Sequence, residues 1–468
     1  MQKVKSRRAV WLAALFIFPV TMFAQVDTVK PKKYELTVKE AVDLGFKNVI
    51  ELKNAVVDYK IQEAKNKELT GQALPQLSGT VGANYYLQLP KLLFPQSDEG
   101  VYSVLRREGL IPQNTQAPPP TLVPFSFQQP WNLTMGATVT QLLFQPDVFV
   151  GLKARKTALG YSQAMIEQTK EKVKDSAYKR YYAILIAQRQ VSFLDESVKR
   201  LEKLYYDDSI MFKNGFAERL DLDKVQVQLN NLRTGKAGVE TGLKIAYAML
   251  KYSLGISQRD TVVLKDELTT ESLKGDILND AFKYEDRAEI RTLNTLQDLQ
   301  KLDVKRYQLG YLPTVALAGN YTVNGMGQKF FTDNNTTWFR SSYVGVNINV
   351  PIFTGFQRKY KVVEAKLNLE KVNNSIELVK QSIDLEQGIT KEALTNALVT
   401  LDVQERNLAL AQKVYNTTKT KFEQGLGSSF EVLQSDTDYQ TAQFNYINAL
   451  YTATVAKISY LSSLGKLQ

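Results

Sequence analysis

The sequence predicts an α+β membrane protein in which long helices continue from a β-barrel and each chain contributes four strands. Two observations carry this prediction. Eight of the 14 prolines lie between residues 90 and 130, which leaves two long tracts without proline whose apolar residues alternate at spacings of three and four. Between these tracts lie segments in which apolar and small polar residues alternate. The first pattern is typical of long packed helices, and the second of strands with one apolar face.

The composition excludes many kinds of active site. The chain has 468 residues, with no cysteine and no histidine. It therefore has no disulfides, no thiolate nucleophile, no histidine base, and no zinc, haem or iron–sulfur site built from these ligands. The composition does not exclude a hydrolase that uses carboxylates, or a Mg²⁺ or Ca²⁺ site. No loop offers the paired acids that such an enzyme needs, so we expect no enzymatic activity, no cofactor and no metal.

The N-terminus has the features of a secretory signal peptide, which we assign to residues 1–24. Four basic residues precede the apolar run 9–23, and that run is shorter than the roughly 20 residues needed to span a bilayer. Removal of this segment leaves 55 Lys and Arg against 48 Asp and Glu, a mild excess without a basic cluster. Nucleic-acid binding is therefore not expected. No other apolar run is long enough for a membrane-spanning helix.

The tracts without proline predict two long helices, over residues 147–211 and 354–421, each about 100 Å long at 1.5 Å per residue. Glycine turns follow them and lead to returning helices. An ordinary helical bundle shows the same periodicity, and the helix lengths favour a coiled-coil-like arrangement. The shorter helices stack in pairs to match a long one. These shorter helices are expected over residues 37–72, 218–255, 276–311 and 428–465.

The alternating segments predict four strands, over residues 76–89, 130–144, 314–324 and 338–351. A half-buried soluble sheet shows the same alternation. The strand lengths and the uncharged Ser, Thr, Asn and Gly face favour a membrane barrel instead. An open sheet edge is not tolerated in lipid and four strands cannot close, so chains must associate. Two chains would give a filled barrel and three an open pore. Residues 90–129, rich in proline, are expected to form an extracellular loop.

The two halves of the chain follow the same order of elements. Leu74-Pro75 corresponds to Leu312-Pro313, and residues 212–255 align without a gap with residues 422–465, which share identities at both ends. This predicts an internally duplicated chain, with one repeat over 25–255 and a second over 276–468. Residues 256–275 would link the repeats at the equator of the helical part.

The segment after the last predicted strand carries a further motif. Pro351, Phe353 and Gly355 lie in the sequence VPIFTGFQR. With the duplicated order of elements, the Leu-Pro pairs and the Phe-x-x-Gly turns, this motif resembles the TolC-like outer-membrane efflux channel family (outer membrane factors) over essentially all of the mature chain.

The resemblance implies a homotrimer with one 12-stranded β-barrel in the outer membrane of a Gram-negative cell. A long α-helical barrel would continue from it into the periplasm. The partners it implies are a periplasmic membrane-fusion adaptor, an inner-membrane pump of the RND, ABC or MFS type, and outer-membrane lipid. The chain would then be the passive exit duct of a tripartite efflux or type I secretion system, for small molecules or proteins.

The resemblance also indicates candidate functional residues at the tips of the helical hairpins. Asp221 and Glu431, six residues beyond the tip glycines, correspond to acids that narrow the periplasmic aperture. First-turn acids favoured by the helix dipole explain them equally well. Asp207 and Asp208 are further aperture candidates, although surface charge is the simpler interpretation for them. The tips resemble adaptor-docking turns, and their residues are Asn214, Gly215, Phe216, Gln424, Gly425, Leu426 and Gly427.

One function from another class fits the same helical pattern. A secreted coiled-coil scaffold or adhesin without a membrane barrel would also have long amphipathic helices. Solubility separates the two, because a scaffold would purify without detergent whereas a channel would need it.

Overall fold

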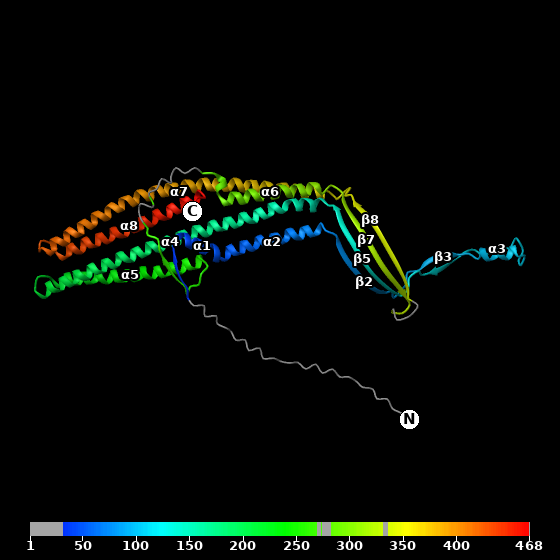
Figure 1. The fold of residues 1–468 in the computed structure, drawn as a ribbon, viewed down its shortest axis with the longest axis horizontal. Coiled ribbons are helices and arrows are strands. Elements are labelled where there is room, and N and C mark those ends of the chain that lie inside the picture. Colours follow the sequence, from blue (N-terminus) through cyan, green and yellow to red (C-terminus); the bar gives the residue numbers. More distant parts are fainter. Residues whose placement is uncertain (1–30, 269–272, 274–281, 331–335, 468) are drawn as a thin grey trace, which may run out of the picture.

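The computed structural model describes residues 31–268, 273, 282–330 and 336–467. The expected signal peptide, residues 1–24, lies outside this part of the chain. The protomer is a long rod of helices with a β-sheet at one end and two helix–helix turns at the other (Figure 1). The α+β class predicted from the sequence is therefore the class of the fold.

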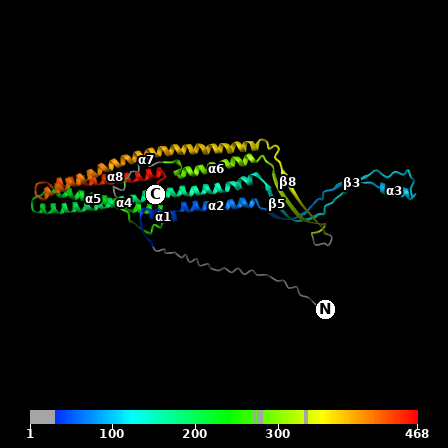
Figure 2. The ribbon, with the colours of Figure 1, turned by 45° about the horizontal axis from the view of Figure 1, so that its top comes forward.

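Two long helices run almost the whole length of the rod. Helix α4 spans Pro146–Lys213 and helix α7 spans Gln357–Glu423. Each turns back at the tip into a shorter helix, α5 (Arg219–Ser253) after α4 and α8 (Ser429–Ser463) after α7. The two views show α4 beside α5 and α7 beside α8, so each long helix forms a hairpin with its successor (Figures 1 and 2).

Further helices fill the half of the rod nearer the sheet (Figure 1). The helix expected over residues 37–72 is two helices, α1 (Val38–Asn48) and α2 (Ile50–Gln72), because Val49 between them has extended backbone angles. Helix α6 (Ala288–Leu309) begins later than the expected residue 276. A 3₁₀ turn, η2 (Tyr284–Asp286), precedes it, and residues 274–281 lie outside the described part.

The main sheet has four antiparallel strands in the order β2-β5-β7-β8. Their bounds are Gln76–Tyr85 for β2, Trp131–Phe144 for β5, Thr314–Gly327 for β7 and Thr337–Asn349 for β8. Among the described residues, β2 and β8 each pair on one side only, so the sheet has two open edges.

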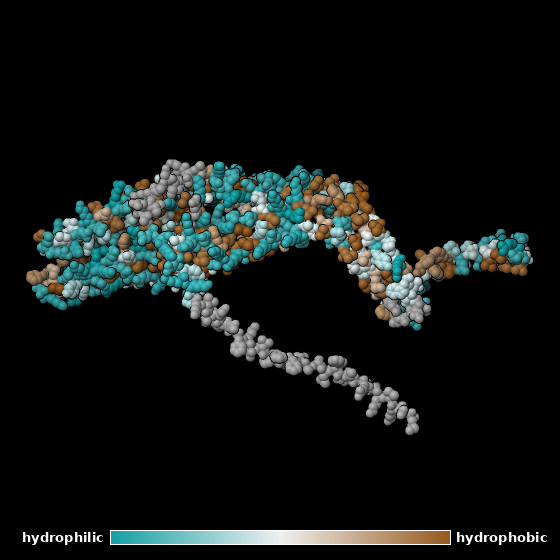
Figure 3. Space-filling model, in the orientation of Figure 1, coloured by the Kyte–Doolittle hydropathy of each residue, from teal (hydrophilic) through white to brown (hydrophobic). Residues whose placement is uncertain are grey.

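The register aligns apolar residues across the strands on one face and polar residues on the other. On the apolar face, Val81 pairs with Met135, which pairs with Val323. On the polar face, the Thr134 hydroxyl donates to the Asn324 side-chain carbonyl at 3.0 Å. Arg340, opposite Val323 near the outer end of β8, is a charged exception on the apolar face. Figure 3 shows hydrophobic residues gathered over the sheet and its junction with the helices.

The tract 90–129, expected to be a loop, contains regular structure. Strands β3 (Leu92–Gln96) and β4 (Thr121–Phe125) pair as an antiparallel hairpin, with helix α3 (Glu99–Arg107) between them. This regular structure was not predicted from the sequence, and the extracellular location of the tract stays a prediction. Leucine, valine and phenylalanine flank the prolines here, and Pro95 and Pro124 lie within a two-stranded ribbon, where every strand is an edge that tolerates proline.

A second small sheet lies at the equator of the rod. Strand β1 (Lys33–Leu36) pairs in parallel with β6 (Thr261–Leu264). The hydroxyl of buried Tyr181 donates to the Leu36 carbonyl at 2.8 Å, and this connects the pair to α4. The expected equatorial linker 256–275 thus includes β6 in its described residues.

Three clusters of buried apolar residues lie in the helical part, and they include Leu250, Leu450 and Val225, respectively. In the described part of the chain, no helix combines the length and the apolar content needed to cross a bilayer.

Helix α7 has apolar residues on two opposite faces. At 3.6 residues per turn, one set faces its own chain and is buried, including Ala365, Ile376 and Ile383. A second set on the opposite side is exposed, with two polar interruptions. We call this second set the outer stripe, and it comprises Tyr360, Val363, Leu367, Leu378, Leu385, Ile389, Val399, Val403, Leu410 and Val414.

Candidate functional site at the hairpin tips

The two tips are built by the same backbone motif. Gly215 and Gly425 have φ angles of 79° and 73°, in the left-handed region that favours glycine. The amide of Phe216 donates to the Met211 carbonyl at 2.8 Å, which closes the end of α4 as in a Schellman motif. Leu426 does the same at the end of α7. Both motifs turn an apolar side chain outward, and Phe216 is 80% and Leu426 76% exposed.

The predicted aperture acids lie in the first turns after the tips. Asp221 in α5 pairs with Lys224 at 3.3 Å, and the Lys224 ammonium also lies 5.1 Å from the centre of the Phe430 ring in α8. Glu431 is exposed, and its amide donates to the Ser428 hydroxyl that caps α8. Lys224 thus brings Asp221 close to the second hairpin, whereas Glu431 faces solvent in the protomer.

The other two candidates differ from each other. Asp207 is partly exposed, but Asp208 is fully buried between α4 and α8, where its carboxylate accepts a hydrogen bond from the Ser429 hydroxyl. Its second oxygen has no hydrogen-bond partner among the described residues. The interpretation as surface charge was therefore wrong for Asp208. The sequence carried a signal, because Asp208 continues the buried series of Leu201 and Leu204 at a spacing of four.

The surroundings of Asp208 favour its neutral form. Burial raises the pKa of its carboxyl above the ordinary value, and nearby Asp221 and Asp207 raise it further, while the hydrogen bond from Ser429 opposes the shift. Asp208 is therefore less readily ionised than an ordinary aspartate.

Sequence reasoning missed a buried ion pair that joins the two hairpins. Arg200 in α4 donates to Asp436 in α8 at 2.7 Å, and the Asp436 side chain is 1% exposed. The guanidinium lies 4.9 Å from the Tyr439 ring centre and 5.5 Å from that of Tyr415. Asp436 lies among the buried positions of α8, which is a signal that the sequence does offer. Its partner, 236 residues earlier, could not be identified from spacing.

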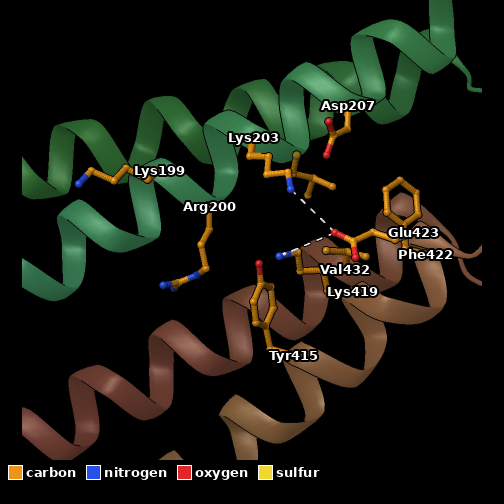
Figure 4. A pocket seen from close by; sticks show the side chains of 10 residues that line it. Lys199, Arg200, Lys203, Asp207, Tyr415, Lys419, Phe422, Glu423 and Val432 are labelled. Atoms are coloured by element: carbon orange, nitrogen blue, oxygen red, sulfur yellow. Dashed lines mark ion pairs between the residues drawn. The ribbon is translucent and has the colours of Figure 1, made fainter.

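A cavity of about 190 Å³ adjoins this pair between α4 and the second hairpin (Figure 4). Its lining is rich in cations, with Lys199, Arg200 and Lys203 from α4 and Lys419 from α7. Glu423 extends between Lys203 and Lys419, at 3.9 and 3.8 Å. The cavity therefore offers a cationic hollow next to the exposed tips.

The strand-to-helix motif lies at the opposite end of α7. Gly355 and Phe356 have φ angles of 60° and 65°, and two successive left-handed residues turn the chain sharply into the helix. The Phe353 and Phe356 rings meet edge to face at 5.6 Å, and Phe353 is 75% exposed. Pro351 ends the preceding strand region. The motif thus places aromatic side chains where the sheet meets the helices.

Comparisons with known proteins agree with this architecture. A family model described as outer membrane efflux protein matches residues 289–466. The outer membrane protein TolC of Vibrio cholerae serotype O1 is 19% identical over 345 residues, which cover 72% of this chain and 77% of that protein.

Solved structures show a similar fold at low sequence identity. The chain superposes on CusC with a TM-score of 0.71 and 15% identity, covering 92% of each chain. The CmeC outer membrane channel of Campylobacter jejuni gives a TM-score of 0.69 at 15% identity, over 92% of this chain and 85% of that one. The open-state MtrE outer membrane channel of Neisseria gonorrhoeae gives 0.65 at 14% identity, over 92% and 89%.

The matched proteins are described as outer membrane efflux proteins and channels, which agrees with the expectation that this chain is not an enzyme. Residues 289–466 therefore match the outer membrane efflux protein family, and most of the chain is similar to TolC in sequence and to outer-membrane channels in fold.

Proposed function

We propose that the chain forms a homotrimeric exit duct of a tripartite efflux or type I secretion system. The observation that carries this proposal is the open four-stranded sheet, with one apolar and one polar face and an unpaired edge on each side. Lipid does not tolerate unpaired strand edges, so the sheet needs neighbours. Three copies give twelve strands, enough for an open lumen lined by the polar face.

The helical part supports the same association. The outer stripe of α7 lies along one flank of the protomer, and α5 presents exposed apolar residues of its own along the other (Figure 1). Those of α5 are Leu220, Val227, Ile245, Met249 and Tyr252. Contacts between two different flanks form a closed ring when the rotation from one protomer to the next closes, as a threefold axis would make it. A helical barrel built in this way would continue the β-barrel into the periplasm.

The order of elements supports internal duplication of the chain. In each half a helix leads into two strands, a long helix, a glycine turn and a returning helix. We propose that the halves, residues 25–255 and 276–468, descend from one repeat, so that the trimer approximates a ring of six hairpins.

The association is tested by purification. A duct should require detergent, have the native mass of a trimer and make planar bilayers conduct ions. A monomer that stays in solution without detergent, the behaviour of a coiled-coil scaffold, would contradict the proposal.

We propose that Asp221 and Glu431 line the periplasmic aperture. Trimer symmetry would turn each into a ring of like charge, which attracts cations. Replacing both by Ala is expected to raise single-channel conductance and weaken block by cations. Asp223→Ala with Asp438→Ala is the matched control, because these exposed acids lie on the same two helices. Equal behaviour of the two double variants would exclude the aperture role.

Adaptor docking is proposed at the tips, where two apolar side chains stand exposed beside the cationic hollow. An adaptor hairpin with apolar and acidic residues would fit this surface, and a separate inner-membrane pump would supply the energy. Replacing Phe216 and Leu426 by Ser should leave the trimer and its conductance unchanged and abolish efflux in cells that depend on this chain. Full efflux by that variant would move docking away from the tips.

A further inference from the structure

The β3–β4 hairpin projects beyond the end of the main sheet that lies away from the helices (Figures 1 and 2). Side chains alternate between the two faces of this ribbon. We call the face with Leu92, Phe94, Val123 and Phe125 the aromatic face, and the face with Leu93, Pro95, Leu122 and Pro124 the proline face. Among the ten strand residues, none is charged.

Three phenylalanine rings form one cluster on the aromatic face. The rings of Phe125 and Phe127 are 4.8 Å apart, and that of Phe94 lies 5.6 Å from Phe127 and 6.3 Å from Phe125. The cluster is nevertheless open to solvent, since Phe94 is 44%, Phe125 52% and Phe127 64% exposed. A two-stranded ribbon is marginally stable in water, and its aromatic face needs a cover.

The position of the ribbon argues against lipid as that cover. At the outer end of the main sheet, the Trp131 ring lies 4.8 Å from the rings of both Tyr85 and Phe330. Aromatic residues of this kind mark the level of the membrane–water interface in spanning strands. The hairpin begins beyond these residues along the chain and extends away from the sheet, so its aromatic face stands in external water.

The geometry points to a second copy of this chain as the cover. This inference rests on the proposed trimer. The hairpin grows from β2, an open edge of the sheet and therefore part of the contact with the next protomer. Three hairpins would be rooted at the same height around one axis, at high effective concentration. We propose that their aromatic faces converge on the threefold axis and form a common apolar cluster that narrows the outer mouth of the duct.

The absence of cysteine from the chain makes this arrangement directly testable. In Phe125→Cys, the new thiol lies on the face that turns toward the axis, so oxidation should link two of the chains in each particle. The matched control is Leu122→Cys, three residues earlier on the same strand but on the proline face and similarly exposed. We expect about tenfold more disulfide-linked dimer from Phe125→Cys than from Leu122→Cys.

A second pair, Phe94→Cys and Leu93→Cys, repeats the comparison on β3. The native mass in detergent is measured for every variant. Trimers in which the aromatic-face cysteines are not linked, or are linked no more than those of the proline face, would overturn the inference, because equal linkage indicates random collision. The proposed duct would not be contradicted by either result. Monomeric particles would instead contradict the proposed function itself.

Discussion

The two ends of the rod differ in whether one chain supplies all the partners of its interactions. At the hairpin tips, one chain supplies both partners of its buried contacts, as in the Arg200–Asp436 pair and the Asp208–Ser429 hydrogen bond. At the other end, the sheet edges and the ribbon beyond them have no partner within the described chain. The hairpin tips can therefore form their buried contacts within one chain, whereas the sheet depends on neighbours and lipid.

The largest expected effect comes from charging the outer stripe of α7. Leu378→Glu with Leu385→Glu places carboxylates where the ring proposal buries apolar residues, and unpaired charge is costly to bury. We expect loss of the trimer, measured as native mass in detergent. The control places the same charges on α7 outside the stripe, in Ser382→Glu with Thr395→Glu. If both double variants remain trimeric, the outer stripe is not an interface.

A smaller effect is expected from substitutions at the hairpin tips. Asp436→Leu leaves the Arg200 guanidinium buried without its carboxylate, which typically costs about 3–5 kcal/mol. The opening free energy of the tip, followed by hydrogen exchange of α8, should fall accordingly. Replacing both partners, in Arg200→Met with Asp436→Leu, should restore most of it, because an apolar pair carries no desolvation penalty. Equal losses in the single and double variants would show that the unpaired guanidinium is not what destabilises the tip.

Asp208 predicts a pH dependence of the same contact. Its pKa is raised in the folded state, so the folded protein binds a proton more tightly than the unfolded chain does. The stability from Asp208 is present in acid and lost as the pH rises through the window between its ordinary and raised pKa values. The opening free energy of the α4–α8 contact, obtained from hydrogen exchange corrected for the intrinsic pH dependence of the exchange rate, should therefore rise on acidification, and Asp208→Asn should remove this rise. An unchanged pH profile in Asp208→Asn would assign the effect to other acids.

The smallest effects concern two glycines. Gly355 has a left-handed backbone, so Gly355→Ala should destabilise by about 1 kcal/mol. Gly388 lies inside α7, where an added methyl group would meet no neighbouring side chain within 4 Å, and Gly388→Ala should stabilise by up to about 1 kcal/mol. Thermal unfolding of the trimer measures both. If Gly388→Ala destabilised the trimer as Gly355→Ala does, contacts with a neighbouring protomer would explain the loss at Gly388.

The main helices and strands could be predicted because the apolar residues of each recur at a regular spacing. The spacing of three and four predicted helices at residues 147–211 and 354–421, where the structure has α4 and α7, and strict alternation predicted the four strands of the main sheet. The break at Val49 could not be predicted from periodicity. Gly255 lies so close to this point that an added Cβ would meet the Asn48 carbonyl at 2.7 Å. Periodicity carries no information on such distant contacts.

The candidate site was less predictable than the fold. The tips follow from glycine and helix length, but the burial of Asp208 and the partner of Asp436 depend on how two hairpins, more than 200 residues apart in sequence, meet. The β3–β4 hairpin was missed because prolines usually indicate irregular loops. In this hairpin the prolines lie in a two-stranded ribbon, which has no interior strand that they could disrupt.

The parallel pairing of β1 with β6 has a consequence for biogenesis. Residues 33–36 pair with residues 261–264, so the first strand cannot form its sheet until residues 228 positions later in the chain are present. A polypeptide that is threaded into the periplasm from its N-terminus can form the first hairpin early, but it cannot close its equator until more than half of its length has been translocated. Contacts so distant in sequence slow folding, and the open N-terminal segment is where we expect periplasmic chaperones to hold the nascent protein.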